Sequence, residues 1–400
     1  MLSGSETQRT RDLRAVLELV RTGKATTRGE IIEHLNLRST TVSELVGEMV
    51  EADLLRESIV KQRGRGRPAA FLTYNTQRFG VVFMQVASRS IVAKSVDMAG
   101  RVVAEVQAAP PAETGNEEMA AALRRLAAEA LGRFPAGVEV VAVVCSFSGL
   151  LDAPRKLWCF SSRWPNVSNL DVGEVLGSLG KDVVLVRNLD AELAGRLANT
   201  EKRREESVLL LHWGYGIGAA YYTEGAIVNR LRGRFCEIGH WSLGNMRGAK
   251  CTCGNTDCLE TVAALWSLGP KIRSVYPDIP LDEDAFGPMA ERMKLVDVPS
   301  IAEATREVVR LTGNLSRLLF PDRIILTGPF VRNPDIFHRF VVALEAAPVL
   351  RGLDRTIVTS GEQGSGHELS GAVEPVFEAA CDKLLRGGDE SEAVLRLDAR

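Results

Sequence analysis

The first fifty-five residues carry apolar side chains at the spacing of helices. The pattern predicts three helices within residues 9–55, each with its own apolar stripe. Gly23 ends the first helix, and Thr26 or Thr27 is a suitable N-cap for the second. The stripes consist of Leu13, Val16, Leu17 and Val20 in the first helix, and Val42, Leu45, Val46, Met49 and Val50 in the third. A small helical head is therefore expected at the start of the chain.

The order of these helices is typical of a helix-turn-helix. A short second helix is followed by the tight turn "NLR" and by a third helix that begins with small polar residues. The start of such a helix faces base edges in DNA, so Arg38, Ser39, Thr40 and Ser43 are candidate DNA-binding residues. A three-helix bundle without DNA contact has the same pattern and stays an alternative.

A basic segment follows the helical head directly. Arg56, Lys61, Arg63, Arg65 and Arg67 stand against a single acid in this stretch, which gives a local charge of +4. The pattern predicts a two-stranded wing whose basic tip includes Arg63, Arg65 and Arg67. Alternating glycine and arginine lets the backbone approach DNA while guanidinium groups reach phosphates or a narrow minor groove. The alternative is a solvated loop between domains.

From residue 79 onward, apolar runs typical of buried strands alternate with helical patterns. This alternation predicts an α/β domain with two similar lobes and a cleft between them. Residues 79–106 are expected to form two strands of one hairpin that turns at "DMAG". The expected divisions are a DNA-binding head at 1–75, a first lobe at 76–200, a second lobe at 201–385 and a charged tail at 386–400. The C-terminal helix is expected to pack back on the first lobe.

Composition narrows the class of protein. The chain has 400 residues, of which 45% are hydrophobic, and this suits two or three domains. The net charge of −2 gives no global case for nucleic-acid binding, so that case rests on the local basic segment. No membrane association is expected, because no run approaches eighteen consecutive apolar residues. The charged N-terminus lacks the apolar core of a signal peptide, so the cytoplasm is the expected compartment.

Three of the seven cysteines lie within eight residues. Cys251, Cys253 and Cys258, with His240 upstream, make a Cys₃His set that suits tetrahedral zinc, and Gly254 permits the turn that joins them. The alternative is a disulfide or a redox-active pair, which leaves His240 without a role. A closed set of four ligands has no open position for water, so one structural zinc per chain is predicted. The remaining cysteines are expected to be small core residues.

The winged helix-turn-helix pattern combines with "WGYGIGAAYYTEGAIV", "EIGH" and "CTCGNTDCLET". Together these segments resemble the ROK family (repressors, open reading frames, kinases), and in particular its sugar-responsive transcriptional repressors. The resemblance runs from about residue 10 to about residue 385. It implies an N-terminal winged helix-turn-helix followed by the two α/β lobes of the actin-like or hexokinase-like ATPase fold.

The resemblance also implies roles for individual residues. Glu237 of "EIGH" and Glu260 of "CLE" correspond to acids that bind sugar hydroxyls, and His240 also faces the sugar. The family has a proline-glycine turn at the sugar site, and this chain retains its glycine, Gly149, without the proline. Asn188 aligns with an asparagine that contacts a sugar hydroxyl in the family. The implied zinc site is structural and folds a loop beside this pocket. Arg163 replaces an asparagine, which favours either an acidic sugar or an ion pair with a nearby acid.

Phosphoryl transfer needs features that this chain has altered. Gln85 stands where ROK kinases have an acid in the first phosphate loop, and Ala87 and Ser88 replace its glycines. Leu189 takes the place of the catalytic base, with Asp190 one residue later. Pro329 replaces a glycine on the nucleotide side, so an ATP-dependent activity is not expected.

The sequence therefore predicts a non-enzymatic transcriptional regulator, and specifically a repressor of carbohydrate-related genes. Its partners would be a double-stranded DNA operator and a sugar or sugar-derivative effector. Because a helix-turn-helix reads two half-sites, a homodimer or a dimer of dimers is expected. Two alternatives stay open: a sugar kinase with an accessory DNA-binding head, and a DNA-binding regulator that responds to no ligand.

Overall fold

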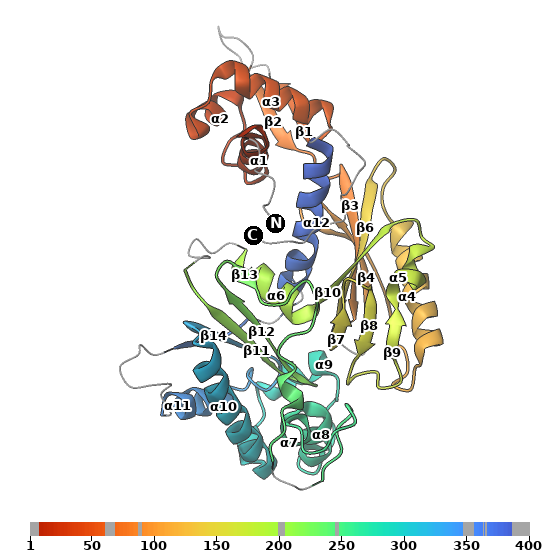
Figure 1. The fold of residues 1–400 in the computed structure, drawn as a ribbon, viewed down its shortest axis with the longest axis vertical. Coiled ribbons are helices and arrows are strands. Elements are labelled where there is room, and N and C mark those ends of the chain that lie inside the picture. Colours follow the sequence, from red (N-terminus) through yellow and green to blue (C-terminus); the bar gives the residue numbers. More distant parts are fainter. Residues whose placement is uncertain are drawn as a thin grey trace.

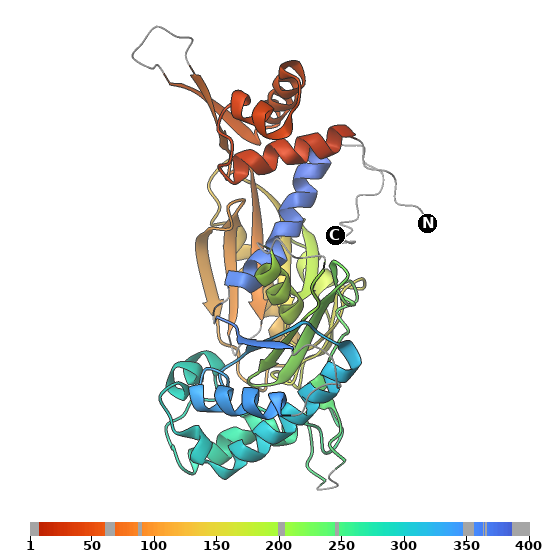
Figure 2. The ribbon, with the colours of Figure 1, turned by 90° about the vertical axis from the view of Figure 1, so that its left-hand side faces the viewer.

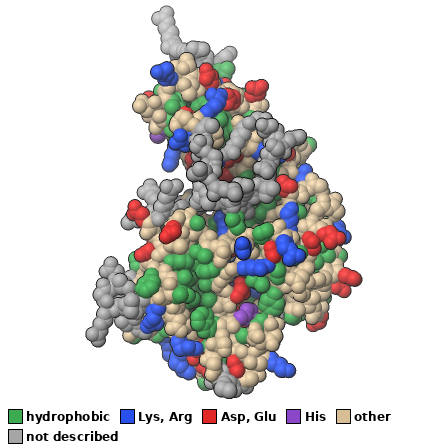
Figure 3. Space-filling view, viewed as in Figure 1, with side chains coloured by type: hydrophobic (Ala, Val, Ile, Leu, Met, Phe, Trp, Pro, Cys, Tyr) green, Lys and Arg blue, Asp and Glu red, His purple; other side chains and the backbone are tan. Residues whose placement is uncertain are grey.

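A computed structural model shows an elongated molecule with a small head at one end of a larger body (Figure 1). The space-filling view shows the head as a narrower lobe with acidic and basic side chains interspersed on its visible face (Figure 3). No helix of the described residues is long and apolar enough to cross a membrane. The structure describes residues 8–60, 69–86, 90–198, 205–244, 248–346, 356–362, 364 and 366–385.

The head contains the three helices predicted from the apolar spacing and one antiparallel strand pair. The Thr27 side chain accepts from the backbone N–H of Glu30, and the Glu30 carboxylate accepts from that of Thr27, which fixes the start of the second helix. Asn36 ends that helix with a left-handed backbone, φ 51°. The elements are α1 (Gln8–Arg21), α2 (Arg28–Leu35), α3 (Ser39–Glu51), β1 (Leu55–Val60) and β2 (Ala69–Tyr74). Residues 61–68, with the predicted wing tip, lie outside the described residues.

The first lobe is built on a five-stranded sheet with the order β10-β6-β3-β4-β5. Strands β3, β4 and β5 form an antiparallel meander. Strand β6 pairs with β3 in parallel, and β10 pairs with β6 in parallel. The predicted hairpin turn at "DMAG" is confirmed, because β4 and β5 pair across it, but the prediction of two strands over residues 79–106 is wrong, because this segment forms three. Nearly every residue of β3 is buried, so the polar-apolar alternation that marks separate strands is missing. The strands are β3 (Phe79–Val86), β4 (Ile91–Asp97), β5 (Val102–Ala108), β6 (Glu139–Phe147) and β10 (Asp182–Arg187).

The second lobe repeats this topology. Its sheet has the order β13-β12-β11-β14-β15, again with an antiparallel meander of three strands followed by two parallel strands. The strands are β11 (Val208–Trp213), β12 (Ile217–Thr223), β13 (Ala226–Ile227), β14 (Arg323–Thr327) and β15 (Ile357–Ser360). The shared strand order makes the two lobes similar in structure.

Helices cover both sheets and fill the space between them (Figure 1). On the first lobe, α4 (Asn116–Leu131) packs against β3, β4 and β5. Between the sheets, α6 (Asn188–Leu197) packs against α12 (Gly366–Leu385). The second lobe carries α7 (Glu260–Ala263), α8 (Leu265–Arg273), α9 (Glu283–Ala290), α10 (Pro299–Leu319) and α11 (Pro334–Glu345). The remaining elements are β7 (Leu150–Asp152), β8 (Leu157–Phe160), β9 (Ser168–Asp171), α5 (Val172–Gly177) and the short 3₁₀ helices Ile238–His240 and Leu295–Asp297.

Helix α12 connects the body to the head. Its N-terminal part packs on α6, β3 and β6, and the helix then runs up to α1, as two perpendicular views show (Figures 1 and 2). Near its C-terminus, Phe377 and Cys381 belong to the same buried apolar cluster as Val16 and Val20 of α1. The head therefore shares one continuous core with the first lobe.

Candidate functional site

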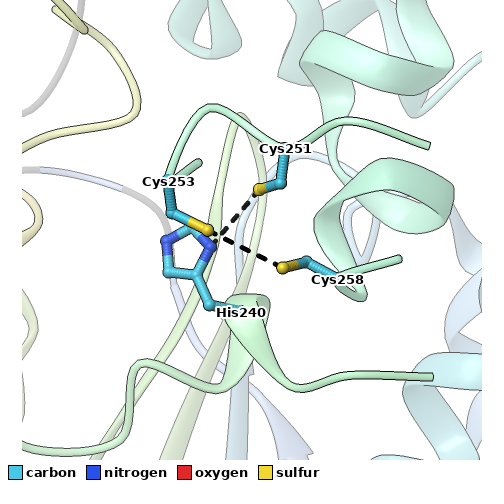
Figure 4. A group of neighbouring side chains, drawn as sticks. All are labelled: His240, Cys251, Cys253 and Cys258. Carbon is cyan, nitrogen blue, oxygen red and sulfur yellow. Dashed lines mark hydrogen bonds between the residues drawn. The ribbon is translucent and has the colours of Figure 1, made fainter. Parts of the chain in front are cut away.

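The four predicted metal ligands converge at one point. His240 ends the 3₁₀ helix Ile238–His240, and the three cysteines come from a folded loop at residues 248–258. An isolated bridge from Ser242 to Cys258 holds this loop against the backbone next to His240, and a second bridge from Lys250 to Thr256 closes the loop on itself. Gly254 has φ 90° at the tip, a conformation that favours glycine. Figure 4 shows the imidazole and the three sulfur atoms pointing toward one another.

The separations of these atoms fit a tetrahedral zinc ion. Cys253 Sγ lies 3.7 Å from Cys258 Sγ, and Cys251 Sγ lies 3.5 Å from His240 Nδ1. All four ligand atoms lie within 4.8 Å of one another. A tetrahedron with zinc–sulfur bonds of about 2.3 Å and zinc–nitrogen bonds of about 2.0 Å has edges of about 3.8 Å and about 3.5 Å. The cluster could therefore hold a metal ion of this kind.

The thiols themselves favour a bound cation over a redox role. All seven cysteines are free. Burial raises the pKa of the Cys251 and Cys258 thiols, so their thiolate forms require a compensating positive charge. Burial acts in the same direction on Cys253, but hydrogen bonds with Asn255, Cys251 and Cys258 outweigh it and lower the pKa of that thiol. A metal ion supplies that charge, whereas a disulfide between two of the cysteines would leave His240 and the third thiol unused.

The residues that the sequence assigned to the effector site line one pocket between the lobes. Its volume is about 70 Å³. It is lined by all five of these residues, namely Gly149, Asn188, Glu237, His240 and Glu260. Gly149 follows β6 with φ 91°, where a Cβ would lie 2.2 Å from the carbonyl oxygen of Phe160. This position therefore requires glycine.

Glu260 is held in place by two donors. The backbone N–H of Ile217 donates to its Oε1 at 3.0 Å, and Trp266 Nε1 donates to its Oε2 at 3.1 Å. Burial raises the pKa of Glu260, while His240 and the Ile217 N–H act in the opposite direction. A Cβ on Gly216 or Gly239 would lie 2.8 Å or 2.7 Å from Oε1, so two glycines make room for this carboxylate.

Sequence reasoning missed Arg187, which organises the opposite wall of the pocket. Its guanidinium is almost completely buried, with Nη1 3.0 Å from Asp190 Oδ1 and Nε 3.4 Å from Glu237 Oε1. Arg187 Nη2 also donates to the carbonyl oxygen of Ala219 at 2.7 Å. An arginine at the end of the apolar run "KDVVLV" was the available signal, because a buried cation requires a partner.

Glu283 and His212 were also missed, and they explain Arg163. Arg163 Nη2 lies 2.5 Å from Glu283 Oε1, so Arg163 forms the ion pair that was one of its two predicted roles. Glu283 Oε2 also lies 3.1 Å from His212 Nε2 and accepts from the N–H of Tyr215 at 2.9 Å. Burial tends to raise the pKa of Glu283, but Arg163 and His212 outweigh it and hold the pKa at about 2. No short motif links residue 163 to residue 283, so the sequence could not reveal the pair.

The positions important for phosphoryl transfer have other contacts. Leu189 lines the pocket, while Asp190 is 1% exposed and lies in its ion pair with Arg187. Burial raises the pKa of the Asp190 carboxyl, and the Arg187 guanidinium opposes that shift. Gln85 Nε2 donates to Glu368 Oε2 at 2.7 Å. Ala87 and Ser88 lie outside the described residues.

The predicted DNA-contacting residues of α3 are exposed. Arg38 is the N-cap, and Ser39, Thr40 and Ser43 follow on the solvent side, where Ser43 Oγ donates to the carbonyl oxygen of Ser39 at 2.8 Å. The opposite side of α3 is buried. Arg63, Arg65 and Arg67 of the wing lie outside the described residues.

Comparisons with known proteins match this architecture. A family model described as the ROK family matches residues 85–374. The DNA-binding transcriptional repressor Mlc of Escherichia coli (strain K12) is 23% identical over 314 residues, which cover 75% of this chain and 76% of Mlc. A glucokinase of Thermotoga maritima is 25% identical over 227 residues, which cover 56% of this chain and 68% of the kinase.

A solved structure shares the fold over almost the whole chain. The crystal structure of a ROK family transcriptional regulator, described as a homolog of the E. coli MLC protein, has a TM-score of 0.72 at 18% identity. The match covers 95% of this chain and 98% of that chain. The fold class predicted from the sequence, a winged helical head followed by a two-lobed actin-like ATPase fold, is confirmed.

Proposed function

This chain belongs to the ROK family, and we propose that it is a DNA-binding transcriptional regulator, specifically a repressor, controlled by a carbohydrate effector. The head would bind a double-stranded DNA operator, and the pocket between the lobes would bind the effector. The observation that carries this proposal is the continuous core between the head and the first lobe. The head presents the exposed start of α3, and the first lobe contributes to the pocket. The similarity to the repressor Mlc supports the same function.

Glu237 and Glu260 are the proposed readers of the effector. Each carboxylate can accept from two adjacent sugar hydroxyls, while Asn188 offers both a donor and an acceptor. Gly149 also lines this pocket, and its φ of 91° with its close approach to the Phe160 carbonyl oxygen fixes the turn that brings the backbone there. His240 would direct Nδ1 to the metal and leave its second ring nitrogen for the pocket.

The proposed cofactor is one structural zinc per chain, bound by His240, Cys251, Cys253 and Cys258. When bound, zinc would cross-link the 3₁₀ helix to the cysteine loop and provide no catalytic position. Cys258 lies two residues before Glu260, so the loop that the cysteines fold also sets the position of an effector-binding carboxylate. Loss of the metal is therefore expected to affect effector binding.

Control of DNA binding would follow from a shift between two lobe arrangements. An effector that binds one arrangement more tightly increases its population. We propose that the protein is a homodimer or a dimer of dimers, because a helix-turn-helix protein reads two half-sites about 34 Å apart. In this proposal, residues 1–75 form the DNA-binding head, 76–200 the first lobe, 201–385 the second lobe and 386–400 the charged tail. The protein would act in the cytoplasm.

A ROK-type sugar kinase with a DNA-binding head is the second candidate, favoured by the similarity to a glucokinase. Two observations argue against it. Leu189 lines the pocket and cannot accept a proton, and Asp190 is committed to Arg187. A regulator that responds to no ligand is the third candidate, and the convergence of five candidate effector residues on one pocket argues against it.

The proposal is tested by DNA binding in the presence of sugars. Operator fragments would be selected from random DNA with the full-length protein, and their affinity measured with and without a panel of sugars and sugar phosphates. At least one sugar should change the operator affinity of the wild type, and Glu260→Ala should abolish that change while leaving basal affinity intact. A protein that selects no DNA sequence would overturn the proposal.

A further inference from the structure

A second hollow lies beside the effector pocket. Its volume is about 270 Å³, compared with about 70 Å³ for the pocket that contains Glu237 and Glu260. We name these the outer chamber and the inner pocket. Both are lined by Ser162, Arg163 and Tyr215, so they adjoin across these three residues. The outer chamber lies where loops of the first lobe face the cysteine loop and α8 of the second lobe.

The outer chamber has the side chains that a sugar ring needs. Trp266 is partly exposed and offers aromatic surface for the apolar face of a ring, while Tyr215, covered on one face by Arg163, adds a smaller part of this apolar wall. Asn166 and Thr252 add an amide and a hydroxyl for sugar hydroxyl groups. Trp266 also donates to Glu260 in the inner pocket, so one side chain contacts both parts of the site.

Arg163 stands in the shared wall with an unused donor. The residue is only 5% exposed, and its Nη1 has no hydrogen-bond partner among the described residues. Its Nη2 pairs with Glu283 at 2.5 Å, and its Cζ lies 4.3 Å from the centroid of the Tyr215 ring. A buried donor without an acceptor is unfavourable. Because Nη1 is closed off from solvent in this arrangement of the side chains, a ligand oxygen at the wall would satisfy it once Arg163 turns toward the ligand.

The charge of the outer chamber favours a neutral ligand. Glu283 balances the charge of Arg163, and Glu113 adds a carboxylate at the exposed rim. The chamber therefore has no excess positive charge for a phosphate or a sugar acid. A ring oxygen, hydroxyl or glycosidic oxygen is the acceptor that suits Arg163 Nη1.

We propose that the effector is a neutral saccharide of at least two rings. One ring occupies the inner pocket, the next packs against Tyr215 and Trp266, and the oxygen-rich linkage between them passes Arg163. The inner pocket alone is well below the volume of about 300–1,000 Å³ that is usual for small-molecule sites, whereas the two together reach that range. This inference rests on the proposed function of the inner pocket as a sugar site.

Calorimetric titration of the full-length protein tests the number of rings. The probes are glucose, galactose, mannose, xylose and N-acetylglucosamine, each compared with the disaccharides that contain it at the reducing or non-reducing end. The best disaccharide is expected to bind at least about tenfold more tightly than either of its component sugars. A monosaccharide that binds as tightly as every disaccharide containing it would overturn the inference.

Two matched variants locate the second ring. Glu113→Trp places a bulky side chain at the rim of the outer chamber, and Glu117→Trp places the same side chain four residues later, on the exposed first turn of α4 outside both hollows. Glu113→Trp is expected to reduce disaccharide affinity at least about tenfold and to leave monosaccharide affinity unchanged. Glu117→Trp should change neither.

The outcomes separate this inference from the proposed function. Equal effects of the two tryptophan variants, or an equal loss of monosaccharide and disaccharide binding in Glu113→Trp, would overturn the second ring site alone. Wild-type protein that binds no saccharide of the panel would overturn the proposed sugar response and this inference with it.

Discussion

Arg14 of α1 and Asp382 of α12 form a two-point ion pair between the first and the last helix. Arg14 Nε lies 2.7 Å from Asp382 Oδ1, and Arg14 Nη2 contacts Oδ2. The opposite end of α12 carries Glu368, which accepts from Gln85 in the first lobe. A helix of 20 residues is about 30 Å long, so α12 contacts both the head and the region between the lobes. Since α12 also packs on α6, whose Asn188 and Leu189 line the inner pocket, it connects the head to one wall of that pocket.

Asp382→Asn should weaken the coupling between effector and operator. The variant loses a partly buried charge-assisted contact at the head, and residues that carry such coupling contribute about 0.5–2 kcal/mol. The effector-induced change in operator affinity should shrink by about 2- to 30-fold, with effector affinity unchanged. Parallel titrations of operator and effector measure both quantities. Glu307→Gln, which breaks the pair with Arg310 on α10, is the control, and equal behaviour of the two variants would rule out this role of α12.

Glu368 should make stability depend on pH. Burial raises its pKa from 4.5 to about 7, against the effects of Ser146 and Gln85, while Glu192 adds to the shift and Lys94 opposes it. Between pH 4.5 and pH 7, the Glu368 carboxyl is therefore protonated in the folded chain and ionised in the unfolded chain. The contribution of Glu368 to the free energy of unfolding should fall by about 3 kcal/mol as pH rises from 4.5 to 7, and stay level above that range.

Glu368→Gln removes this titration and tests it. At pH 8 the variant should be more stable than the wild type by up to about 3 kcal/mol, and near pH 4.5 the difference should vanish. Urea unfolding at both pH values gives the two free energies. Glu345→Gln changes an exposed residue of α11 and should follow the wild type. A constant difference between Glu368→Gln and the wild type at all pH values would contradict the assignment.

Local patterns predicted the local parts of the structure. The spacing of Leu13, Val16 and Val20 and the capping residue Thr27 specified the helices of the head, because helix formation depends on neighbours in sequence. The meander at residues 79–106 was misread because burial on both faces removes the alternation that separates strands.

In the candidate site too, local patterns were predicted and contacts between distant residues were not. The Cys₃His set could be predicted because three ligands lie within eight residues. Arg163, Glu283 and His212 come together only through the packing of two lobes, and no spacing in the chain reveals such a contact. The sequence marks Arg187 as a buried cation that needs an acidic partner. It does not show that Asp190 and Glu237 are the acids that pair with it.

Purified protein should contain one zinc per chain, and Cys258→Ser should lose it. The cluster fixes the cysteine loop next to Glu260, so loss of the metal should also reduce effector affinity by about 10- to 100-fold. Elemental analysis and calorimetry measure the two effects. Cys159→Ser removes a thiol outside the cluster and should retain both metal and effector binding. Zinc-free protein with full effector affinity would contradict the structural role.

The wing and α3 should contribute differently to DNA binding. Arg65→Ala with Arg67→Ala should weaken binding to all sequences and reduce the salt dependence by about one unit of slope for each lost phosphate contact. Thr40→Ala and Ser43→Ala should instead relax sequence preference, because these exposed side chains lie at the start of α3. Gel-shift titrations at several salt concentrations separate the two effects. Arg125→Ala, an exposed arginine of α4, is the control, and the wing assignment fails if the double variant binds like it.

The last prediction separates regulator from kinase and depends on Leu189. Transfer of a phosphoryl group to a sugar hydroxyl needs a proton acceptor at that oxygen, and removal of a general base typically costs 10²–10⁴-fold in rate. Leu189 lines the inner pocket, and Asp190 is buried against Arg187, so this part of the chain presents no carboxylate to the pocket. A coupled ADP-release assay across the sugar panel, with a ROK glucokinase assayed in parallel, should show no sugar-dependent turnover. ATP should not change operator affinity, whereas turnover of about one per second with any sugar would assign Asp190 as the base and establish the kinase.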